Sequence, residues 1–153
     1  MYLSSGFARG GNVENKSTYT DAAERIYHEW DKALAQNDIN ALLALYAEDA
    51  VLESPLIPYL LNKEEGICRG HAEIREIVEQ VAIRKPNLRK YYRTPCLKLG
   101  NLIMWEYPRN SPGGEQMDFA EIMDLNEKGV IESHRVYWGW RGVKVLKDDA
   151  YRQ

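Results

Sequence analysis

The chain contains few of the residues from which metal and redox sites are built. Among its 153 residues there are two cysteines, Cys68 and Cys96, and three histidines, His28, His71 and His134. Neither set has the spacing of a metal-binding or redox motif. Cysteines outside such motifs are most often small buried hydrophobes. The sequence therefore predicts no metal site.

An excess of positive charge and long hydrophobic runs are also missing. The formal net charge is -3 at pH 7, whereas a nucleic-acid surface needs clustered Lys and Arg. Every apolar run is short and broken by proline or charge, so no segment is predicted to span a membrane. The first twenty residues lack the apolar core of a signal peptide. We therefore expect a cytoplasmic protein that binds neither nucleic acid nor membrane.

What the chain does contain suits one globular domain. Hydrophobic residues make up 44% of the sequence and charged residues 28%, which is ordinary for such a protein. Residues 1–17 are rich in Gly, Ser and Asn and are predicted to form a flexible tail. Residues 18–153 are predicted to form a single domain.

Two helices are predicted near the start of this domain. Asp21 followed by Glu24 resembles a capping box, which satisfies free backbone N–H groups at a helix start. Apolar residues then recur at helical spacing from Ala23 to Leu34. Asp38 is suited to cap a second helix, whose apolar side is predicted to run from Ile39 to Tyr46.

A strand, a long connection and a third helix follow. The segment "AVLES" (50–54) favours a short strand, and "PLIPYLLNKEEGICRG" (55–70) is predicted to be a loop. The segment "HAEIREIVEQVAIR" (71–84) has one apolar stripe at helical spacing, and Pro86 is predicted to close that helix.

After Pro86 the hydrophobic period changes from helical to strand-like. Four segments are rich in Tyr, Trp, Val and Ile, and turn-forming residues separate them. The segments are "LRKYYRTPCLKL", "NLIMWEY", "EQMDFAEIMDL" and "VIESHRVYWGW". Helices first and an antiparallel meander second predict an α+β domain, with helices packed on one face of a curved sheet.

The segment "ALAQNDINALLALYAEDAVLESP" resembles the nuclear transport factor 2-like superfamily, which includes ketosteroid isomerases and SnoaL-type polyketide cyclases. The closing "NEKGVIESHRVYWG" is similar to the last hairpin of that superfamily, and the resemblance covers most of residues 18–142. It implies a cone-shaped fold with three N-terminal helices packed on the concave face of a curved antiparallel sheet. It also implies a pocket between those layers and a homodimer formed through the sheet.

The positions that carry chemistry in ketosteroid isomerases are mostly changed here. The resemblance places Ser54 where those enzymes have the general base, an Asp directly before a Pro. It places Trp30 where they have an oxyanion-binding Tyr, and Glu121 where they have a second acid. A hydroxyl does not shuttle protons near neutral pH without a base beside it. The resemblance therefore does not imply the ketosteroid isomerase mechanism.

The hairpin "AEIMDLNEKGVIESHR" contains the two polar residues of greatest interest. If Leu125 pairs with Val130, Glu121 lies directly opposite His134 on the face of the hairpin that is richer in large apolar groups. That face also carries Met117, Phe119, Met123, Glu132, Val136 and Trp138. We predict that it points into the pocket.

Two interpretations of this pair remain open. Glu121 can orient His134 so that the imidazole exchanges a proton with a substrate, or the two side chains can simply satisfy each other as buried polar groups. The pocket walls are predicted to bind substrate through six residues: Trp30, Ser54, Trp138, Tyr27, Phe119 and Met117. The apolar residues between Leu56 and Leu61 are predicted to be either a lid over the pocket or a contact with a second subunit.

The leading hypothesis is a cofactor-free enzyme that performs proton-transfer chemistry, as an isomerase, cyclase or dehydratase, on a small hydrophobic molecule. His134 and Glu121 are its predicted catalytic residues. One alternative is a non-catalytic domain of the same fold that binds a small molecule. Another is a dimeric assembly domain whose pocket no longer functions.

Overall fold

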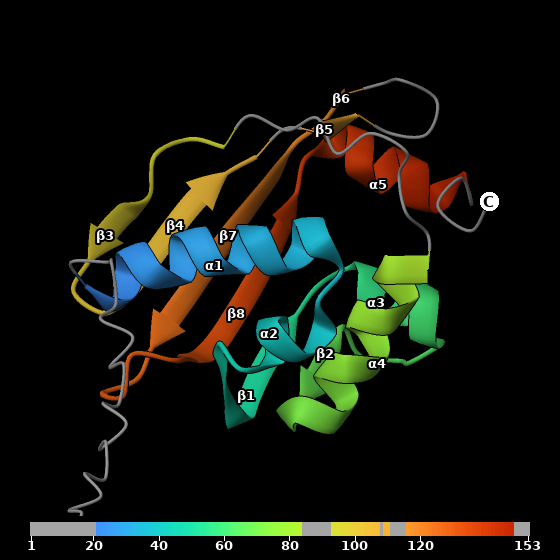
Figure 1. Ribbon diagram of the computed structural model, residues 1–153. Coiled ribbons are helices and arrows are strands. Elements are labelled where there is room, and N and C mark those ends of the chain that lie inside the picture. The colour runs from blue at the N-terminus through green and yellow to red at the C-terminus, as the bar shows by residue number, and fades with distance from the viewer. Residues whose placement is uncertain (1–20, 84–92, 108, 111–115, 149–153) are drawn as a thin grey trace, which may run out of the picture.

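The computed structural model describes residues 21–83, 93–107, 109–110 and 116–148 (Figure 1). The predicted flexible tail lies outside these residues. The helices are α1 (Ala22–Gln36), α2 (Ile39–Leu43), α3 (Leu56–Leu61), α4 (Gly70–Ile83) and α5 (Trp140–Lys147). The strands are β1 (Tyr46–Glu53), β2 (Ile67–Arg69), β3 (Leu97–Leu99), β4 (Leu102–Glu106), β5 (Arg109–Asn110), β6 (Gln116–Met117), β7 (Phe119–Leu125) and β8 (Ile131–Trp138).

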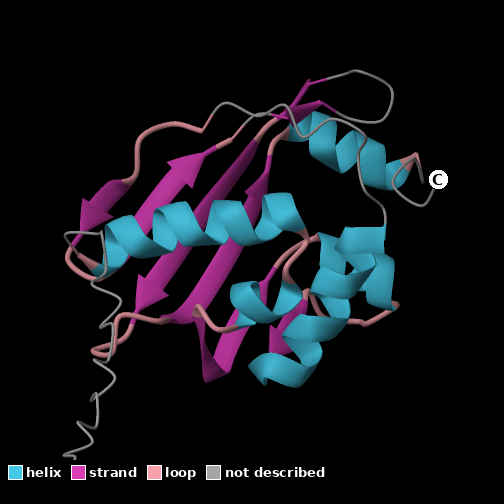
Figure 2. Cartoon of the chain, viewed as in Figure 1, coloured by secondary structure: helices cyan, strands magenta, loops and turns pink. Residues whose placement is uncertain are grey.

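Six of these strands form one curved sheet, in the order β2-β1-β8-β7-β4-β3. β1 and β8 are parallel, and every other neighbouring pair in this sheet is antiparallel. α1 crosses β4, β7 and β8, while α2 and α4 cover the β1 end of the same face (Figure 2). The predicted α+β class, with helices on the concave face of a mostly antiparallel sheet, is confirmed.

The core lies between this helical layer and the sheet. Ile26 from α1, Ile74 from α4, Ile103 from β4 and Met123 from β7 are all fully buried there. Burial of such side chains is worth roughly 1.5–3 kcal/mol each. None of the described helices combines the length and the apolar character needed to cross a membrane.

The predicted caps of the first two helices are confirmed. The Asp21 carboxylate accepts a hydrogen bond of 2.9 Å from the backbone N–H of Glu24. The Asp38 carboxylate accepts one of the same length from the N–H of Ala41. Each bond satisfies an N–H group that has no partner within its own helix.

The second helix ends earlier than predicted. α2 stops at Leu43, and Tyr46 already belongs to β1, where it pairs with Ile131 of β8. The backbone N–H of Ile131 donates to the carbonyl of Leu45 at 2.8 Å. This ladder to a distant strand overrides the local helical pattern, and it moves the Tyr46 side chain from a helix face to the pocket.

Residues 55–70 are not the exposed loop that the sequence suggested. They contain α3 and β2, and Leu56 and Ile57 are 7% and 0% exposed. Tyr59, Leu60 and Leu61 pack against the core with partial burial. Core packing therefore uses part of this apolar run, and its role as a lid or as a subunit contact stays a prediction.

The turn between β7 and β8 forms at the predicted residues. The backbone N–H of Asn126 donates to Val130 at 2.9 Å, and Gly129 adopts a left-handed conformation with φ +73°. A side chain at Gly129 would also meet the Ala22 Cβ at 2.8 Å. Only glycine suits both demands.

The predicted pairing within this hairpin is wrong by two residues. Glu121 lies opposite Val136, and His134 lies opposite Met123. Glu121 and His134 are therefore diagonal neighbours and not direct cross-strand partners. Since side chains alternate with a period of two, a shift of two leaves each of them on its predicted face.

The shift has two local causes. At the turn, Leu125 pairs with Ile131 and not with Val130, which moves the register by one residue. A β-bulge then leaves Glu132 without an opposite residue, which moves it by one more.

The end of the chain departs from the strand pattern. β8 ends at Trp138, and α5 begins at Trp140, although the last predicted strand extended to Trp140. No side chain caps α5, because its N-cap residue is Gly139. The sequence therefore lacks the usual signal for a helix start.

Candidate functional site

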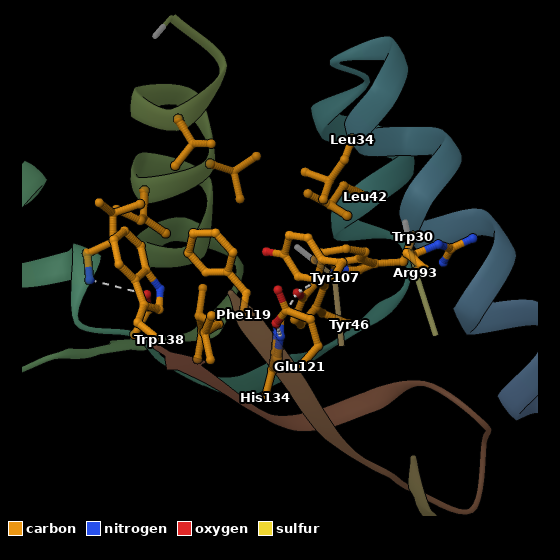
Figure 3. A pocket seen from close by; sticks show the side chains of 17 residues that line it. Trp30, Leu34, Leu42, Tyr46, Arg93, Tyr107, Phe119, Glu121, His134 and Trp138 are labelled. Carbon is orange, nitrogen blue, oxygen red and sulfur yellow. Dashed lines mark hydrogen bonds and ion pairs between the residues drawn. The ribbon is translucent and has the colours of Figure 1, made fainter. Parts of the chain in front are cut away.

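A cavity of about 120 Å³ lies between the helices and the concave face of the sheet (Figure 3). Side chains from α1, α2, α3, α4, β1, β7 and β8 line it, together with Ser54, Arg93 and Tyr107. Leu34 and Leu42 lie at its helical end, and Glu121 and His134 lie at the sheet. Most of the wall is aliphatic or aromatic, which is typical of small-molecule sites.

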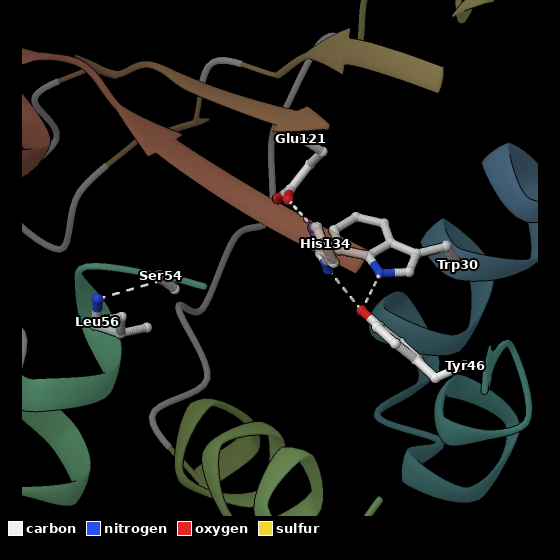
Figure 4. Close-up of polar contacts among 6 residues, drawn as sticks. All are labelled: Trp30, Tyr46, Ser54, Leu56, Glu121 and His134. Carbon is white, nitrogen blue, oxygen red and sulfur yellow. Dashed lines mark hydrogen bonds and ion pairs between the residues drawn. The ribbon is translucent and has the colours of Figure 1, made fainter. Parts of the chain in front are cut away.

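Two ionisable side chains are buried at the sheet end of this cavity. The Glu121 and His134 side chains are 2% and 3% exposed. His134 Nε2 forms a hydrogen bond with Glu121 Oε2 (Figure 4). The predicted inward face of the hairpin and the contact between these residues are thus present in the structure.

The hydrogen bonding continues beyond His134 to the helical layer. The Tyr46 hydroxyl lies 2.7 Å from His134 Nδ1. The Trp30 indole N–H donates to the same hydroxyl at 3.3 Å. Four buried side chains from α1, β1, β7 and β8 therefore form one hydrogen-bonded chain (Figure 4).

Burial raises the pKa of the Tyr46 phenol above its usual range. The hydrogen bond from Trp30 acts in the opposite direction, and the negative charge of Glu121 raises the pKa further. Tyr46 is therefore a neutral phenol at physiological pH.

Replacing Tyr46 with Phe is expected to reduce the loss of folding stability that the protein undergoes at high pH. Because the folded-state pKa is raised, the unfolded chain loses this proton first, above about pH 10. Stability linked to the neutral phenol is present below that pH and is lost as pH rises further, by about 1.4 kcal/mol per pH unit. Urea unfolding between about pH 8 and about pH 11 measures it. The stability difference between wild type and Tyr46→Phe should fall above about pH 10, and a constant difference would contradict the assignment.

Among the described residues, the Ser54 hydroxyl forms a single hydrogen bond. Its side-chain oxygen accepts a hydrogen bond of 3.2 Å from the backbone N–H of Leu56, as expected for a turn cap. The residue is 7% exposed and lies on the cavity wall. A hydroxyl that accepts one bond still has its hydrogen to donate, so Ser54 can bind an acceptor atom of a ligand.

Four of the six predicted substrate-binding residues line the cavity. They are Trp30, Ser54, Phe119 and Trp138. The indole N–H of Trp30 is already given to Tyr46, so this residue offers a ligand its ring and not its donor.

Tyr27 and Met117 do not line the cavity, contrary to expectation. The Tyr27 hydroxyl donates to the Thr94 carbonyl at 2.9 Å, and its ring packs edge-on against Trp105. Met117 is fully buried in β6, which pairs with β5 in a separate two-stranded sheet. Each side chain is therefore used in packing away from the cavity.

Two polar wall residues, Tyr46 and Arg93, were not predicted from the sequence, where Tyr46 was expected on a helix. Several aliphatic wall residues, such as Leu34, were not predicted either. The Arg93 guanidinium is 3.3 Å from the Asp31 carboxylate and lies over the Tyr27 ring at 3.8 Å from its centroid. Its charge is thus balanced locally.

α5 supports the cavity wall from outside. A Cβ atom added at Gly142 would lie 2.7 Å from Cε3 of the Trp138 indole, which is closer than atoms can approach. Glycine is therefore required for α5 to pack directly against this wall residue.

Gly142→Ala is expected to push the Trp138 indole into the cavity. Overpacking of this kind costs about 1–3 kcal/mol, against a gain of about 1 kcal/mol in helix propensity. A crystal structure of the variant would show the displaced ring, and the affinity for a benzene-sized ligand should fall. An unmoved ring with unchanged affinity would contradict the role given to Gly142.

Among the described residues, no cluster of His, Cys, Asp and Glu side chains has the arrangement of a metal site. The two cysteines are free thiols, with Cys68 buried and Cys96 half-buried. Burial is the main cause that raises the pKa of both thiols, which favours unreactive, protonated cysteines.

Comparisons with solved structures give the fold. A SnoaL-like protein of unknown function from Burkholderia thailandensis is 18% identical, with 77% of this chain and 94% of that chain covered and a TM-score of 0.64. An NTF2-like protein of unknown function from Burkholderia pseudomallei is 16% identical, with 83% and 98% covered and a TM-score of 0.66. A steroid delta-isomerase from Pseudomonas aeruginosa is 19% identical, with 86% and 90% covered and a TM-score of 0.65.

Comparison with protein-family models and with curated protein sequences gives no match. The structural likeness shows that the chain has the NTF2-like cone fold, as the sequence resemblance implied. A shared fold does not establish a shared activity.

Proposed function

We propose that the protein is a cofactor-free enzyme that moves a proton on a small, mostly apolar carbonyl compound bound in the cone pocket. One observation carries this proposal. A buried carboxylate, Glu121, lies on the wall of a mostly apolar cavity, and among the described residues only its Oε2 atom has a hydrogen-bond partner. A buried ionisable group in a pocket is a recognised sign of a functional site.

Glu121 is the residue that meets the substrate in this proposal. No described residue donates a hydrogen bond to its Oε1 atom, whereas Oε2 is bonded to His134. Both ring nitrogens of His134 are engaged, by Glu121 and by Tyr46. The earlier hypothesis that the imidazole itself exchanges a proton with the substrate is revised accordingly: His134 orients Glu121, and Glu121 transfers the proton.

The proton transfer takes two steps. Glu121 Oε1 removes a proton from the carbon next to the substrate carbonyl, and the electron pair of the broken C–H bond moves to the carbonyl oxygen. The Ser54 hydroxyl donates a hydrogen bond to that oxygen and stabilises its negative charge. Glu121 then returns the proton to another carbon of the same molecule. General acid–base catalysis of this kind contributes about 10²- to 10⁴-fold in rate.

The cavity volume limits the size of the substrate. A cavity of about 150 Å³ in another protein binds benzene, and the cavity here is about 120 Å³. We therefore propose a substrate with a single small ring or a short chain.

The isomerisation of 3-cyclohexenone to its conjugated isomer tests the proposal. This ketone has one six-membered ring and an acidic carbon between its carbonyl and its double bond. Formation of the conjugated product is followed by ultraviolet absorbance. The purified protein is expected to accelerate the reaction well above the buffer rate, and no acceleration at any accessible concentration would contradict the proposal.

A second candidate function is non-catalytic binding of a small apolar molecule. It is favoured by the completeness of the polar chain, because Trp30, Tyr46 and His134 satisfy one another without a ligand. Calorimetry with 2-cyclohexenone, the product ketone, separates the two functions. A binder retains this ketone without isomerising its β,γ-unsaturated isomer, whereas the proposed enzyme does both.

A further inference from the structure

The chain of four buried side chains has a donor at one end and an acceptor at the other. Trp30, Tyr46, His134 and Glu121 are 6%, 5%, 2% and 1% exposed. Three hydrogen bonds join them in that order. Figure 4 shows that the chain runs from the helical layer to the sheet. The chemistry of each group determines which partner donates and which accepts in each of these hydrogen bonds.

The direction is set at the Trp30 end. An indole nitrogen only donates, so the Tyr46 oxygen is the acceptor in the first bond. The single hydrogen of the Tyr46 hydroxyl must then go elsewhere. Among the described residues, the acceptor within reach is His134 Nδ1 at 2.7 Å. Nδ1 therefore carries no hydrogen.

The position of the imidazole's N–H hydrogen follows from the bare Nδ1. A neutral histidine with a bare Nδ1 carries its hydrogen on Nε2. That N–H points at Glu121 Oε2 and donates to it. If Nδ1 were protonated instead, it would face the Tyr46 oxygen, and the buried hydroxyl hydrogen would lose its acceptor. An unsatisfied buried donor lowers the population of such a state by about tenfold or more.

We infer that Trp30 and Tyr46 are positioning residues: they fix the tautomer of His134 and thereby fix Glu121 Oε1 as the atom that meets the ligand. The neutral Tyr46 phenol, whose pKa burial raises, keeps the hydrogen that this arrangement requires. The catalytic consequence rests on the proposed function, whereas the tautomer itself does not.

Nitrogen-15 NMR of the histidine ring tests this inference without any substrate. The chain has three histidines, and neither His28 nor His71 lines the cavity. A His28→Gln/His71→Gln background therefore leaves signals from His134 alone. The expected spectrum at neutral pH has a protonated Nε2 and a hydrogen-bonded, unprotonated Nδ1. A protonated Nδ1 would overturn the inference.

Tyr46→Phe in this background removes the hydroxyl donor to Nδ1. The Nδ1 signal is then expected to shift and the ring to populate both tautomers. Tyr27→Phe is the matched control, because it removes a hydroxyl that bonds to Thr94 outside the chain. The control should leave the His134 spectrum unchanged. If Tyr46→Phe also leaves it unchanged, Tyr46 does not position the ring.

Trp30→Phe is the second variant and covers the case in which Tyr46→Phe fails to fold. It removes the indole donor and should perturb the Nδ1 signal in the same direction, by a smaller amount. With 3-cyclohexenone, Tyr46→Phe is expected to lower kcat about tenfold while KM stays within about twofold. A change in KM alone would contradict a positioning role. The predicted tautomer without turnover would refute the proposed function and leave this inference standing.

Discussion

Glu121→Gln is expected to lower kcat for 3-cyclohexenone by about 100-fold or more. The glutamine side chain keeps the size of the glutamate, and its carbonyl oxygen still accepts the hydrogen bond from His134 Nε2. It has no basic oxygen, so it cannot remove a proton from carbon. The proton transfer should therefore fail in a folded protein whose cavity is unchanged, and steady-state kinetics measures the loss.

Two controls accompany this variant. Glu132→Gln makes the same chemical change in the same hairpin, at an exposed bulge residue that does not line the cavity. It should leave kcat unchanged. Affinity of Glu121→Gln for 2-cyclohexenone should stay within a few-fold of wild type, because the apolar walls are intact. Full activity in Glu121→Gln would rule out the assigned base.

His134→Leu is expected to destabilise the fold strongly. It leaves the buried Glu121 carboxylate without its donor and the Tyr46 hydroxyl without its acceptor. Leaving a buried charge, here the Glu121 carboxylate, without its partner costs about 3–5 kcal/mol. For a chain of this size such a loss lowers the melting temperature by roughly 6–20 °C. Calorimetric or circular dichroism melting measures it.

The double variant Glu121→Leu/His134→Leu shows whether the pair contributes to stability. Both polar groups are then replaced by apolar side chains, and such exchanges are often neutral or stabilising. We expect the double variant to regain at least half of the stability that His134→Leu loses. A double variant as unstable as the single one would mean that the pair is kept for structure, which favours the binding function.

The inward face of the last hairpin could be predicted from the sequence, and its pairing could not. Alternating apolar residues place Glu121 and His134 on the buried face whatever the pairing, provided that it shifts by an even number of residues. The bulge at Glu132 depends on contacts that no local pattern encodes. A diagonal contact replaces the predicted direct one.

Tyr46 shows why the rest of the site could not be predicted. Its sequence neighbourhood is apolar at helical spacing, yet a strand ladder to Ile131 decides its conformation. That ladder joins residues far apart in the sequence, and local periodicity cannot reveal it. The hydrogen bonds through Trp30 and Tyr46 therefore could not be predicted from the sequence, whereas the contact between Glu121 and His134 could.

Gly142, in the C-terminal helix α5, is a second residue whose role could not be predicted from the sequence. Helix α5 has no capping side chain, and its packing against Trp138 depends on a close approach that glycine permits. A glycine inside a short segment normally argues against a helix. The structural reason for this residue appears only when the indole is seen beside it.

The central claim is that Glu121 transfers a proton between carbon atoms of a ligand in this cavity. Proton NMR of 3-cyclohexenone in deuterated buffer tests it most directly, at the carbon between the carbonyl and the double bond. The account predicts that the wild-type protein accelerates loss of these hydrogens, and that Glu121→Gln leaves them at the rate of buffer alone. Equal exchange with both proteins, or none above buffer with either, would contradict it.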